Sequence, residues 1–296
     1  MDNLFVSTSN GIYMLDLHSN EPTTVLNNKH TPGLFKKRSK GFFGICAMNE
    51  PHKLLVSSRE RLSLRKHNKP TTDTKLFTID TKSLEYQNIA TIRDVHDAHQ
   101  ICCLDQNVFI TDTGKNRVVV YNLPEQKVIK YINIGPVRDD IHHINAVLVI
   151  ENALLIGLNN RGRESQILHF DLSKLTQSSD KHIDAMEHAT IDTIHNVSHS
   201  HDLEPCGGDI LCCSSHKGMV VNTKTSKAII QTDMWVRGLA ATTEHLWVGA
   251  SFIASRKERH GKEIDGTIHQ YRRSDWSLIQ SHVIKGSGQI NDLVLG

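Results

Sequence analysis

The sequence predicts an all-β protein, a six-bladed β-propeller with four-stranded blades, in which strands from the two ends of the chain share one blade. Two observations lead to this prediction. Short apolar stretches, each preceded by a polar loop, recur along the 296 residues at intervals of 36 to 59 residues. The remaining interval, counted through Gly296 and on from Met1, is 51 residues, so the repeats close on themselves. Repeats of this length with several short strands each are typical of propellers and solenoids.

Six copies of one stretch define the repeats, and together they make residues 1–296 a single domain. Each copy is a loop that leads into a buried strand. The copies lie at 42–46, 94–104, 140–147, 199–204, 235–240 and 288–293. The apolar residues that align them are Ile45, Ile101, Ile144, Leu203, Leu239 and Ile290.

Alternating apolar residues between turn signals predict the strands. The first repeat offers 4–8 and 11–17, joined by a Ser-Asn-Gly turn, but no inner strand. Residues 289–295 would supply that strand, and a blade shared in this way leaves no sheet edge open. The other five blades are expected to hold strands at 44–48, 53–57, 75–80 and 86–92; 100–104, 108–111, 117–122 and 127–134; 144–150, 153–158, 166–172 and 189–194; 201–204, 209–214, 218–222 and 227–231; and 237–242, 245–250, 267–272 and 278–283. A polar excursion at 173–188 interrupts the fourth blade, with one helical turn expected around 183–187.

One repeat resembles a known propeller motif. Residues 110–121, Ile-Thr-Asp-Thr-Gly-Lys-Asn-Arg-Val-Val-Val-Tyr, are similar to the NHL repeat: an Asp ends one strand, a tight turn with Asn and Arg follows, and an alternating apolar strand ends in an aromatic residue. The rest of the chain resembles more loosely the six-bladed propellers of the NHL, SMP-30 and streptogramin-lyase groups. The resemblance implies the same architecture, and since no characterised enzyme family matches, it leaves the activity open.

Composition excludes several classes of protein. The formal net charge of +2 is too small for a protein that binds polyanions over its whole surface, which argues against a general nucleic-acid binder. The first residues, Met-Asp-Asn-Leu-Phe-Val-Ser-Thr, predict no signal peptide, and no apolar stretch is long enough to predict a membrane span. The six cysteines show no Cys-x-x-Cys spacing, which favours reduced thiols and a cytoplasmic location.

The candidate metal ligands lie two positions before the aligned apolar residues. These positions hold Phe43, His99, His142, His201, Arg237 and Gly288. Equivalent positions of successive blades surround one axis, so their side chains would converge at the mouth of the central channel. Three imidazoles suit a divalent transition metal, with zinc favoured and Mn, Fe or Ni as alternatives, and leave a coordination position open. His99, His142 and His201 are therefore the predicted ligands, and a register difference of one residue would replace His142 by His143.

A carboxylate lies within two residues of each of these histidines in the sequence and could orient its ring. The three carboxylates are Asp97, Asp140 and Asp202. The constellation of three inner-strand histidines and an arginine resembles the zinc centre of the peptidyl-amidoglycolate lyases, which are also six-bladed, although their sequence pattern is absent here. The competing interpretation is that each histidine is an ordinary packed residue.

Two long basic loops are expected beside the histidines. In an up-and-down blade, the loop that leads into the inner strand and the loop between the second and third strands open on the same face. The loops at 58–70 and 252–265 are of the second kind. The basic residues expected around the mouth are Arg59, Arg61, Arg65, Lys66, Lys69, Lys115, Arg117, Arg161, Arg163, Arg256, Lys257, Arg259 and Lys262. A basic rim around a concave site attracts anionic ligands.

Two functional hypotheses follow. The first is a metal-dependent lyase or hydrolase that acts on a small anionic substrate, with His143 or His96 as acid or base. Arg237 would clamp a carboxylate or phosphate. The further arginines expected to bind the substrate are Arg61, Arg65, Arg161, Arg163, Arg256 and Arg259. The second is a non-catalytic propeller that binds an acidic protein, a glycan or a nucleic acid through its basic loops. Metal content would discriminate between them.

Overall fold

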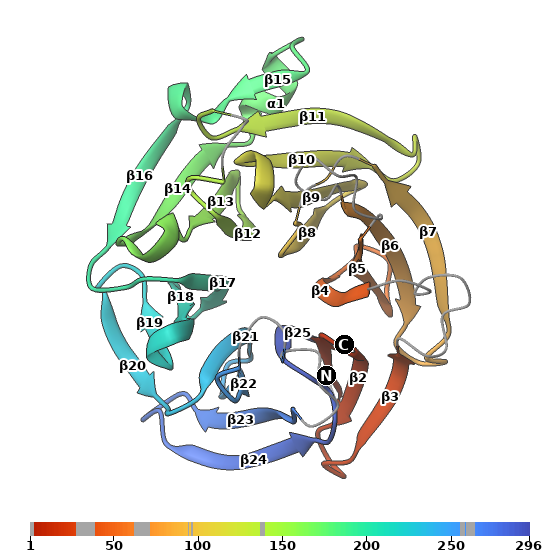
Figure 1. Ribbon diagram of the computed structural model, residues 1–296, viewed down its shortest axis with the longest axis vertical. Helices are drawn as coiled ribbons and strands as arrows, with labels where there is room; N and C mark the ends of the chain where they lie inside the picture. Colours follow the sequence, from red (N-terminus) through yellow and green to blue (C-terminus); the bar gives the residue numbers. More distant parts are fainter. Residues whose placement is uncertain are drawn as a thin grey trace.

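The computed structural model describes residues 3–27, 39–61, 72–93, 95, 97–136, 140–254, 258 and 264–296, without the side chains of 39, 40, 60, 61 and 72. Six antiparallel sheets surround a central axis (Figure 1), which confirms the predicted six-bladed β-propeller. In each blade the strands follow one another from the axis outward, so the innermost strands β25, β4, β8, β12, β17 and β21 line the channel.

The strands of the six blades have the following bounds. Blade 1 holds β25 (Ile290–Leu295), β1 (Asn3–Thr8), β2 (Gly11–Asp16) and β3 (Pro22–Asn27). Blade 2 holds β4 (Ser39–Ala47), β5 (Lys53–Arg61), β6 (Thr72–Asp80) and β7 (Tyr86–Ile92), and blade 3 holds β8 (Ile101–Leu104), β9 (Asn107–Asp112), β10 (Arg117–Asn122) and β11 (Lys127–Asn133). Blade 4 holds β12 (Ile144–Ile150), β13 (Ala153–Leu158), β14 (Ser165–Asp171) and β16 (Ala189–Ile194). Blade 5 holds β17 (Ser200–Cys206), β18 (Asp209–Ser214), β19 (Met219–Asn222) and β20 (Lys227–Gln231), and blade 6 holds β21 (Trp235–Ala241), β22 (His245–Ser251), β23 (Gly266–Arg272) and β24 (Leu278–Ile284).

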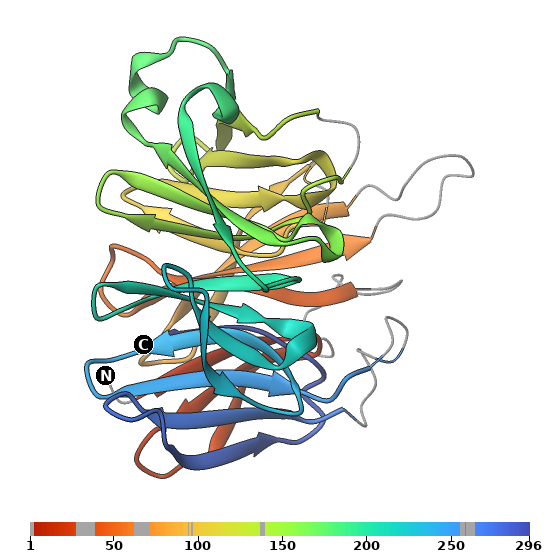
Figure 2. The ribbon, with the colours of Figure 1, turned by 90° about the vertical axis from the view of Figure 1, so that its left-hand side faces the viewer.

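The ring is closed by strands from both ends of the sequence, as predicted. β25 pairs with β1 in antiparallel register, with Leu4 opposite Leu295 and Val6 opposite Leu293. Both ends of the chain lie on one face of the disc (Figure 2), and the first residues of the inner strands lie on the other. Closure pairs the two sheet edges that an open ring would expose.

Two short strands were not predicted. β3 is the outermost strand of blade 1 and begins at Pro22, a residue that a sheet tolerates only at an edge or at the start of a strand. β15 (His182–Asp184) leaves blade 4 after the helix α1 (Ser173–Gln177) and pairs in parallel with β11 of blade 3, with Ile183 opposite Ile132. The helical turn expected around 183–187 is the short 3-10 helix at Ala185–Glu187.

The apolar core lies between neighbouring blades. Phe5 and Ile12 of blade 1, for example, pack with Phe42, Leu54 and other apolar residues of blade 2. Alternate side chains of a strand point to opposite faces of its sheet, and each blade has a neighbour on both faces. The second strands therefore contain runs of consecutive apolar residues, such as 108–110 in β9 and 153–156 in β13, which explains the strong strand signal in the sequence.

The predicted arrangement of the loops follows from the strand register. Trp235, at the start of β21, pairs with Ser251, and Ser251 also pairs with Gly266. The connection between the second and third strands of blade 6 therefore leaves from the face on which its inner strand begins. Among the described residues, no helix is long and apolar enough to cross a membrane. All six cysteines are free thiols, and a cytoplasmic location stays a prediction.

Candidate functional site

Hydrogen bonds between inner strands show which residues of the six blades are equivalent. In three blades, a polar side chain accepts a hydrogen bond from a backbone N–H of the next blade: Asp292 from Ile45 (3.0 Å), Gln100 from Val147 (3.0 Å) and Asp202 from Leu239 (2.5 Å). We call the residues at this level the bridging positions. They are Gly44, Gln100, Ala146, Asp202, Gly238 and Asp292, each of which precedes an equivalent apolar residue.

This equivalence corrects the sequence alignment in two blades. Val147 and Leu293, not Ile144 and Ile290, correspond to Ile45, so the predicted alignment was wrong by three residues there. The register of β12 shifts between Ile144 and Ala146, and that of β25 shifts beside Asn291. A β-bulge adds a residue to one strand and redirects the side chains around it. Similar shifts occur in β4, β17 and β21, where the alignment was right, so they do not explain the error. The error arose because Ile144 and Ile290 are themselves apolar and stand three positions before Val147 and Leu293.

The residues two before the corrected apolar positions form one ring, which we call the cavity ring. They are Phe43, His99, Asn145, His201, Arg237 and Asn291, and together with Gln100 and Asp202 they line a central cavity. Four of these six were predicted, whereas Asn145 and Asn291 take the places expected for His142 and Gly288. The cavity has a volume of about 10 Å³, which is room for one water-sized group.

His142 and His143 have different surroundings. Nδ1 of His142 lies 3.2 Å from Oδ1 of Asn160, and its ring is not among those that contact His99. The ring of His143 lies 5.4 Å from that of His99, centroid to centroid, and its Nδ1 is 2.9 and 3.0 Å from the two oxygens of Asp140. The structure thus brings together His99, His143 and His201, the alternative that a register difference of one residue would give.

Hydrogen bonds fix the tautomer of His201. Its ring centroid lies 5.9 Å from that of His99, and its Nδ1 lies 3.0 Å from the backbone oxygen of His199. A carbonyl oxygen only accepts, so Nδ1 carries the proton. Nε2 then accepts from the amide nitrogen of Asn145 at 3.0 Å. His201 therefore has partners at both nitrogens, and Oγ of Ser215 also lies 2.8 Å from Nδ1.

Two buried guanidinium groups flank His99. Arg59 is 4% exposed, donates to the backbone oxygen of Ala98 and to Asp97, and lies 3.5 Å from the ring centroid of Phe43. Arg237 is 6% exposed and lies 5.3 Å from the ring centroid of Trp235. Burial holds the pKa of His99 well below its usual value, and the charges of Arg59, His143, His201 and Arg237 lower it further. The positive charge of the mouth thus acts directly on His99.

The acidic residues near the mouth have partners. Asp97 pairs with Arg59, and Asp140 binds both His143 and Arg161. Of the three carboxylates expected to orient histidines, Asp140 does so for His143. Asp202 instead accepts from the backbone nitrogens of Leu203 and Leu239 and from Gln100.

The carboxyl groups deeper in the channel are harder to ionise. Burial raises the pKa of Asp202 to about 6 and that of Asp292 well above its usual range. Burial, followed by the charge of Asp202, raises the pKa of Glu204 to about 8. The mouth of the channel therefore carries positive charge, and the carboxyl groups below the mouth resist ionisation.

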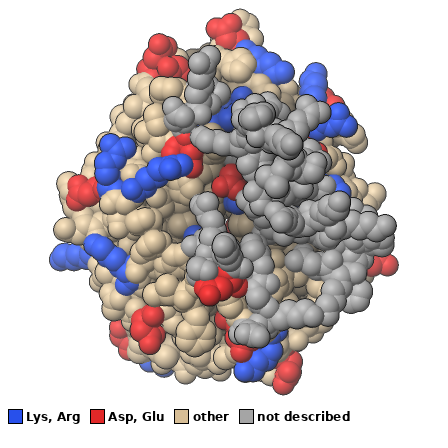
Figure 3. All heavy atoms as spheres, in the orientation of Figure 1, with Lys and Arg blue, Asp and Glu red and all other residues tan. Residues whose placement is uncertain are grey.

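The remaining predicted residues are spread over the rim or lie outside the described part. Arg163 is exposed, and its Nε lies 3.4 Å from the backbone oxygen of Asn160. His96, Arg65, Arg256, Arg259 and the side chain of Arg61 lie outside the described residues, so binding of an acidic macromolecule through the basic loops stays a prediction. Within the described ranges, no group of three or more His, Cys, Asp or Glu could hold a metal ion. Figure 3 shows this face, where described basic and acidic side chains are both scattered over the surface.

Sequence reasoning missed Asn145 and Asn291, and it placed Arg59 in a loop on the rim. A signal for the two asparagines was present: Ile144-Asn145-Ala146-Val147 and Ile290-Asn291-Asp292-Leu293 share the pattern Ile-Asn-x-apolar. The burial of Arg59 has no such signal, because it depends on Phe43 and Ala98 from other segments.

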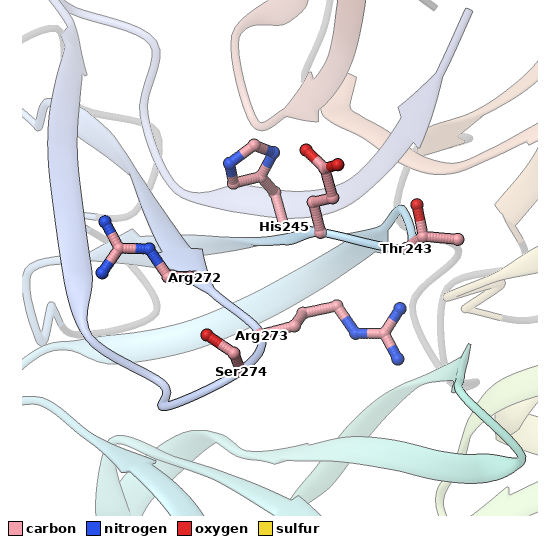
Figure 4. A pocket seen from close by; sticks show the side chains of 6 residues that line it. Thr243, His245, Arg272, Arg273 and Ser274 are labelled. Carbon is pink, nitrogen blue, oxygen red and sulfur yellow. The ribbon is translucent and has the colours of Figure 1, made fainter.

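A larger surface pocket lies on the opposite face, where the hairpin turns of blade 6 meet. Its volume is about 490 Å³, and Thr243, Glu244, His245, Arg272, Arg273 and Ser274 line it. The guanidinium groups of Arg272 and Arg273 point away from each other (Figure 4), and Arg273 donates to the backbone oxygen of Thr242. The two guanidinium groups therefore do not converge on one ligand position, so we take the channel mouth as the stronger candidate.

Comparisons with known proteins place the chain in the class of β-propellers and no further. No protein-family model matches it, and no curated protein matches it. A solved structure of a nidogen/laminin complex superposes with a TM-score of 0.65 at 10% identity, covering 99% of this chain and 97% of the other. A Bacteroides caccae protein of unknown function gives 0.62 at 12% identity, with coverages of 99% and 97%. TolB of Acinetobacter baumannii gives 0.60 at 10% identity, with coverages of 99% and 66%. Identities this low show the fold alone.

Proposed function

We propose that the mouth of the channel binds a small anionic molecule. The observation that supports this most is the buried guanidinium group of Arg237, which lines the central cavity together with His99. The charge of Arg59 also acts on His99, although Arg59 is paired with Asp97, and Asp140 is paired with His143 and Arg161. An anion at the mouth would therefore meet a positive potential in a concave site, where field lines are concentrated and solvent screening is weak.

The chemistry of the ring favours a carboxylate or a phosphate. Guanidinium groups bind both through parallel N–H···O hydrogen bonds. At neutral pH His99 is uncharged, because its pKa is held well below its usual value. A neutral imidazole has one donor and one acceptor nitrogen, so His99 can donate to an anionic oxygen without carrying a charge of its own.

Calorimetric titration with propionate and with inorganic phosphate tests the proposal. We expect binding at low salt that weakens as salt is added, since charges are screened over about 10 Å at 0.1 M. Arg237→Gln should weaken binding about tenfold or more, whereas Arg272→Gln, in the same blade but on the opposite face, should not change it. Equal affinity in both variants, or no binding of either probe, would overturn the proposal.

A second candidate function is that of a metal-dependent lyase or hydrolase. One observation supports it. Asp140 holds Nδ1 of His143, and a backbone oxygen holds Nδ1 of His201. Metal-binding imidazoles usually donate their second nitrogen to such partners. His99, His143 and His201 do not form a metal site in their present arrangement, so these rings would have to move closer together before they could hold an ion that polarises a carbonyl or supplies hydroxide. Asn145 would first have to release Nε2 of His201.

Elemental analysis of protein purified without a histidine tag tests this second candidate. Stoichiometric zinc, manganese, iron or nickel that both His99→Ala and His201→Ala remove, with the fold intact, would support it. Protein that is free of metal and shows no calorimetric binding of these ions would exclude it. The anion site would be unaffected by that result, because it depends on Arg59 and Arg237.

A further inference from the structure

Two asparagines of the cavity ring face the axis from opposite blades. Asn145 is the second residue of β12 in blade 4, and Asn291 is the second residue of β25 in blade 1. Blade 1 lies across the ring from blade 4 (Figure 1). Both line the central cavity. They occupy equivalent positions of the two blades, so both side chains contact the same small cavity.

The orientation of both amides is fixed. Nδ2 of Asn145 donates to the backbone oxygen of Ser200 at 3.1 Å, and Nδ2 of Asn291 donates to that of Phe42 at 2.7 Å. A flipped amide would place two oxygens against each other, so the assignment of Oδ1 follows from the contacts. Both Oδ1 atoms are buried and have no hydrogen-bond partner among the described residues, and Asn145 is only 2% exposed.

Two unpaired buried acceptors in one cavity indicate a missing donor. Leaving such an oxygen unsatisfied costs about 1–3 kcal/mol, so most buried polar groups have partners. The cavity of about 10 Å³ accommodates one water-sized group. A single hydroxyl or amino group is therefore the largest part of a ligand that the cavity accepts, and it must donate a hydrogen bond.

We propose that the ligand is a small 2-hydroxy carboxylate. This inference rests on the proposed anion site and adds the group beside the anion. The hydroxyl donates to Oδ1 of Asn145 or Asn291 in the cavity, while the carboxylate lies next to Arg237, which lines the same cavity. An ammonium group would also donate, but Arg59 and Arg237 would repel its charge. The neutral hydroxyl therefore suits this site better than the amino group of an amino acid.

Matched ligand pairs test the inference on the intact protein. Lactate and propionate differ only in the hydroxyl, as do glycolate and acetate. We expect each hydroxy acid to bind at least about tenfold more tightly than its partner, since a site with buried acceptors discriminates against a ligand that leaves them unpaired. Alanine should bind more weakly than lactate. Equal affinity of lactate and propionate would overturn the inference, and tighter binding of alanine would overturn the choice of a hydroxyl.

Two variants separate this inference from the proposed function. Because one hydroxyl donates to one acceptor, at least one of the variants Asn145→Leu and Asn291→Leu, from opposite blades, should reduce the ratio of lactate affinity to propionate affinity. Arg237→Gln should weaken both ligands alike. If propionate binds but the leucine variants keep the preference, the asparagines are not the acceptors and the inference fails alone. If no carboxylate binds, the anion site fails with it. Should both leucine variants unfold, the comparison of lactate with propionate in the wild type still decides.

Discussion

Two neighbouring levels of the inner strands, one residue apart, use buried polar groups in opposite ways. At the bridging positions, Asp202 accepts from three donors, and Asp292 accepts from the backbone nitrogens of Ile45 and Leu293. In the cavity ring, Oδ1 of Asn145 accepts from none of the described residues. Burial of polar groups therefore does not by itself mark a functional site. Both levels join blades, because Asn145 and Asn291 donate to backbone oxygens of the next blade. What distinguishes the cavity ring is the pair of buried Oδ1 atoms that accept from none of the described residues.

The bridging level also alternates between large and small residues around the ring. Gln100, Asp202 and Asp292 reach the next blade, whereas Gly44, Ala146 and Gly238 lie between them. A Cβ at Gly44 would come within 2.6 Å of the backbone nitrogen of Ile101, so the small residues allow close approach of the blades. The cavity ring shows no such alternation, which is consistent with a different role.

Removing both the bridging residue and the cavity-ring residue of one blade should have the largest effect on stability. Deletion of residues 289–296 takes away β25, and with it Asn291, Asp292 and the pairing with β1. We expect the truncated chain to lose cooperative urea unfolding followed by circular dichroism, because the core between blades 1 and 2 loses an inner wall. Removal of Gly296 alone leaves the strand in place and serves as the control. A cooperative transition in the truncated chain would contradict closure by β25.

Removing one bridging side chain should have the next largest effect. Asp202→Ala leaves the backbone nitrogens of Leu203 and Leu239 and the amide of Gln100 without their acceptor. Each unsatisfied buried donor costs about 1–3 kcal/mol, so we expect the free energy of unfolding to fall by about 3 kcal/mol or more. Asp233→Ala, at an exposed position, should change it by less than about 0.5 kcal/mol. Equal effects would remove the distinction between the two levels.

Ionisation of Glu204 should make the free energy of unfolding depend on pH. Its pKa of about 8 in the folded protein lies well above that of an unfolded glutamate, so the folded state binds the extra proton between these values. Stability must therefore fall as pH rises towards 8, by up to about 1.4 kcal/mol per pH unit. The lowered pKa values of His99 and His199 act in the opposite direction but only at lower pH.

Glu204→Gln isolates this contribution. The amide oxygen of glutamine can still accept from the backbone nitrogen of Ala241, as Glu204 does at 2.8 Å. Urea unfolding between pH 6.5 and 8 should show a smaller loss of stability in this variant than in the wild type. Glu187→Gln, on the surface, should keep the wild-type slope. Parallel slopes in wild type and Glu204→Gln would show that Glu204 ionises normally.

The fold could be predicted from sequence far better than the site. Apolar strands sandwiched between blades give a strong repeating signal, and closure by 289–295 followed from the repeat length. β15 was missed because three residues carry no periodicity, and its pairing with β11 depends on tertiary contact. In the site, the alignment was displaced by three residues in two blades, because Ile144 and Ile290 are apolar residues three positions before Val147 and Leu293. Apolar spacing does not distinguish the two candidates, and only the repeated Ile-Asn-x-apolar pattern separated them.

His99→Gln should have the smallest effect on stability and a clear effect on binding. Among the described residues no hydrogen bond between blades depends on this side chain, so we expect the free energy of unfolding to change by less than about 1 kcal/mol, well below the effect of Asp202→Ala. Affinity for propionate should fall about tenfold. In the wild type a bound anion raises the pKa of His99, so the complex binds more protons than the free protein, and affinity should rise as pH falls through the pKa of His99 in the complex. Calorimetry from pH 5 to 8 should show this rise weakened in His99→Gln and kept in His52→Gln, which alters an exposed turn. Destabilisation as large as that of Asp202→Ala would instead assign His99 a role in joining the blades.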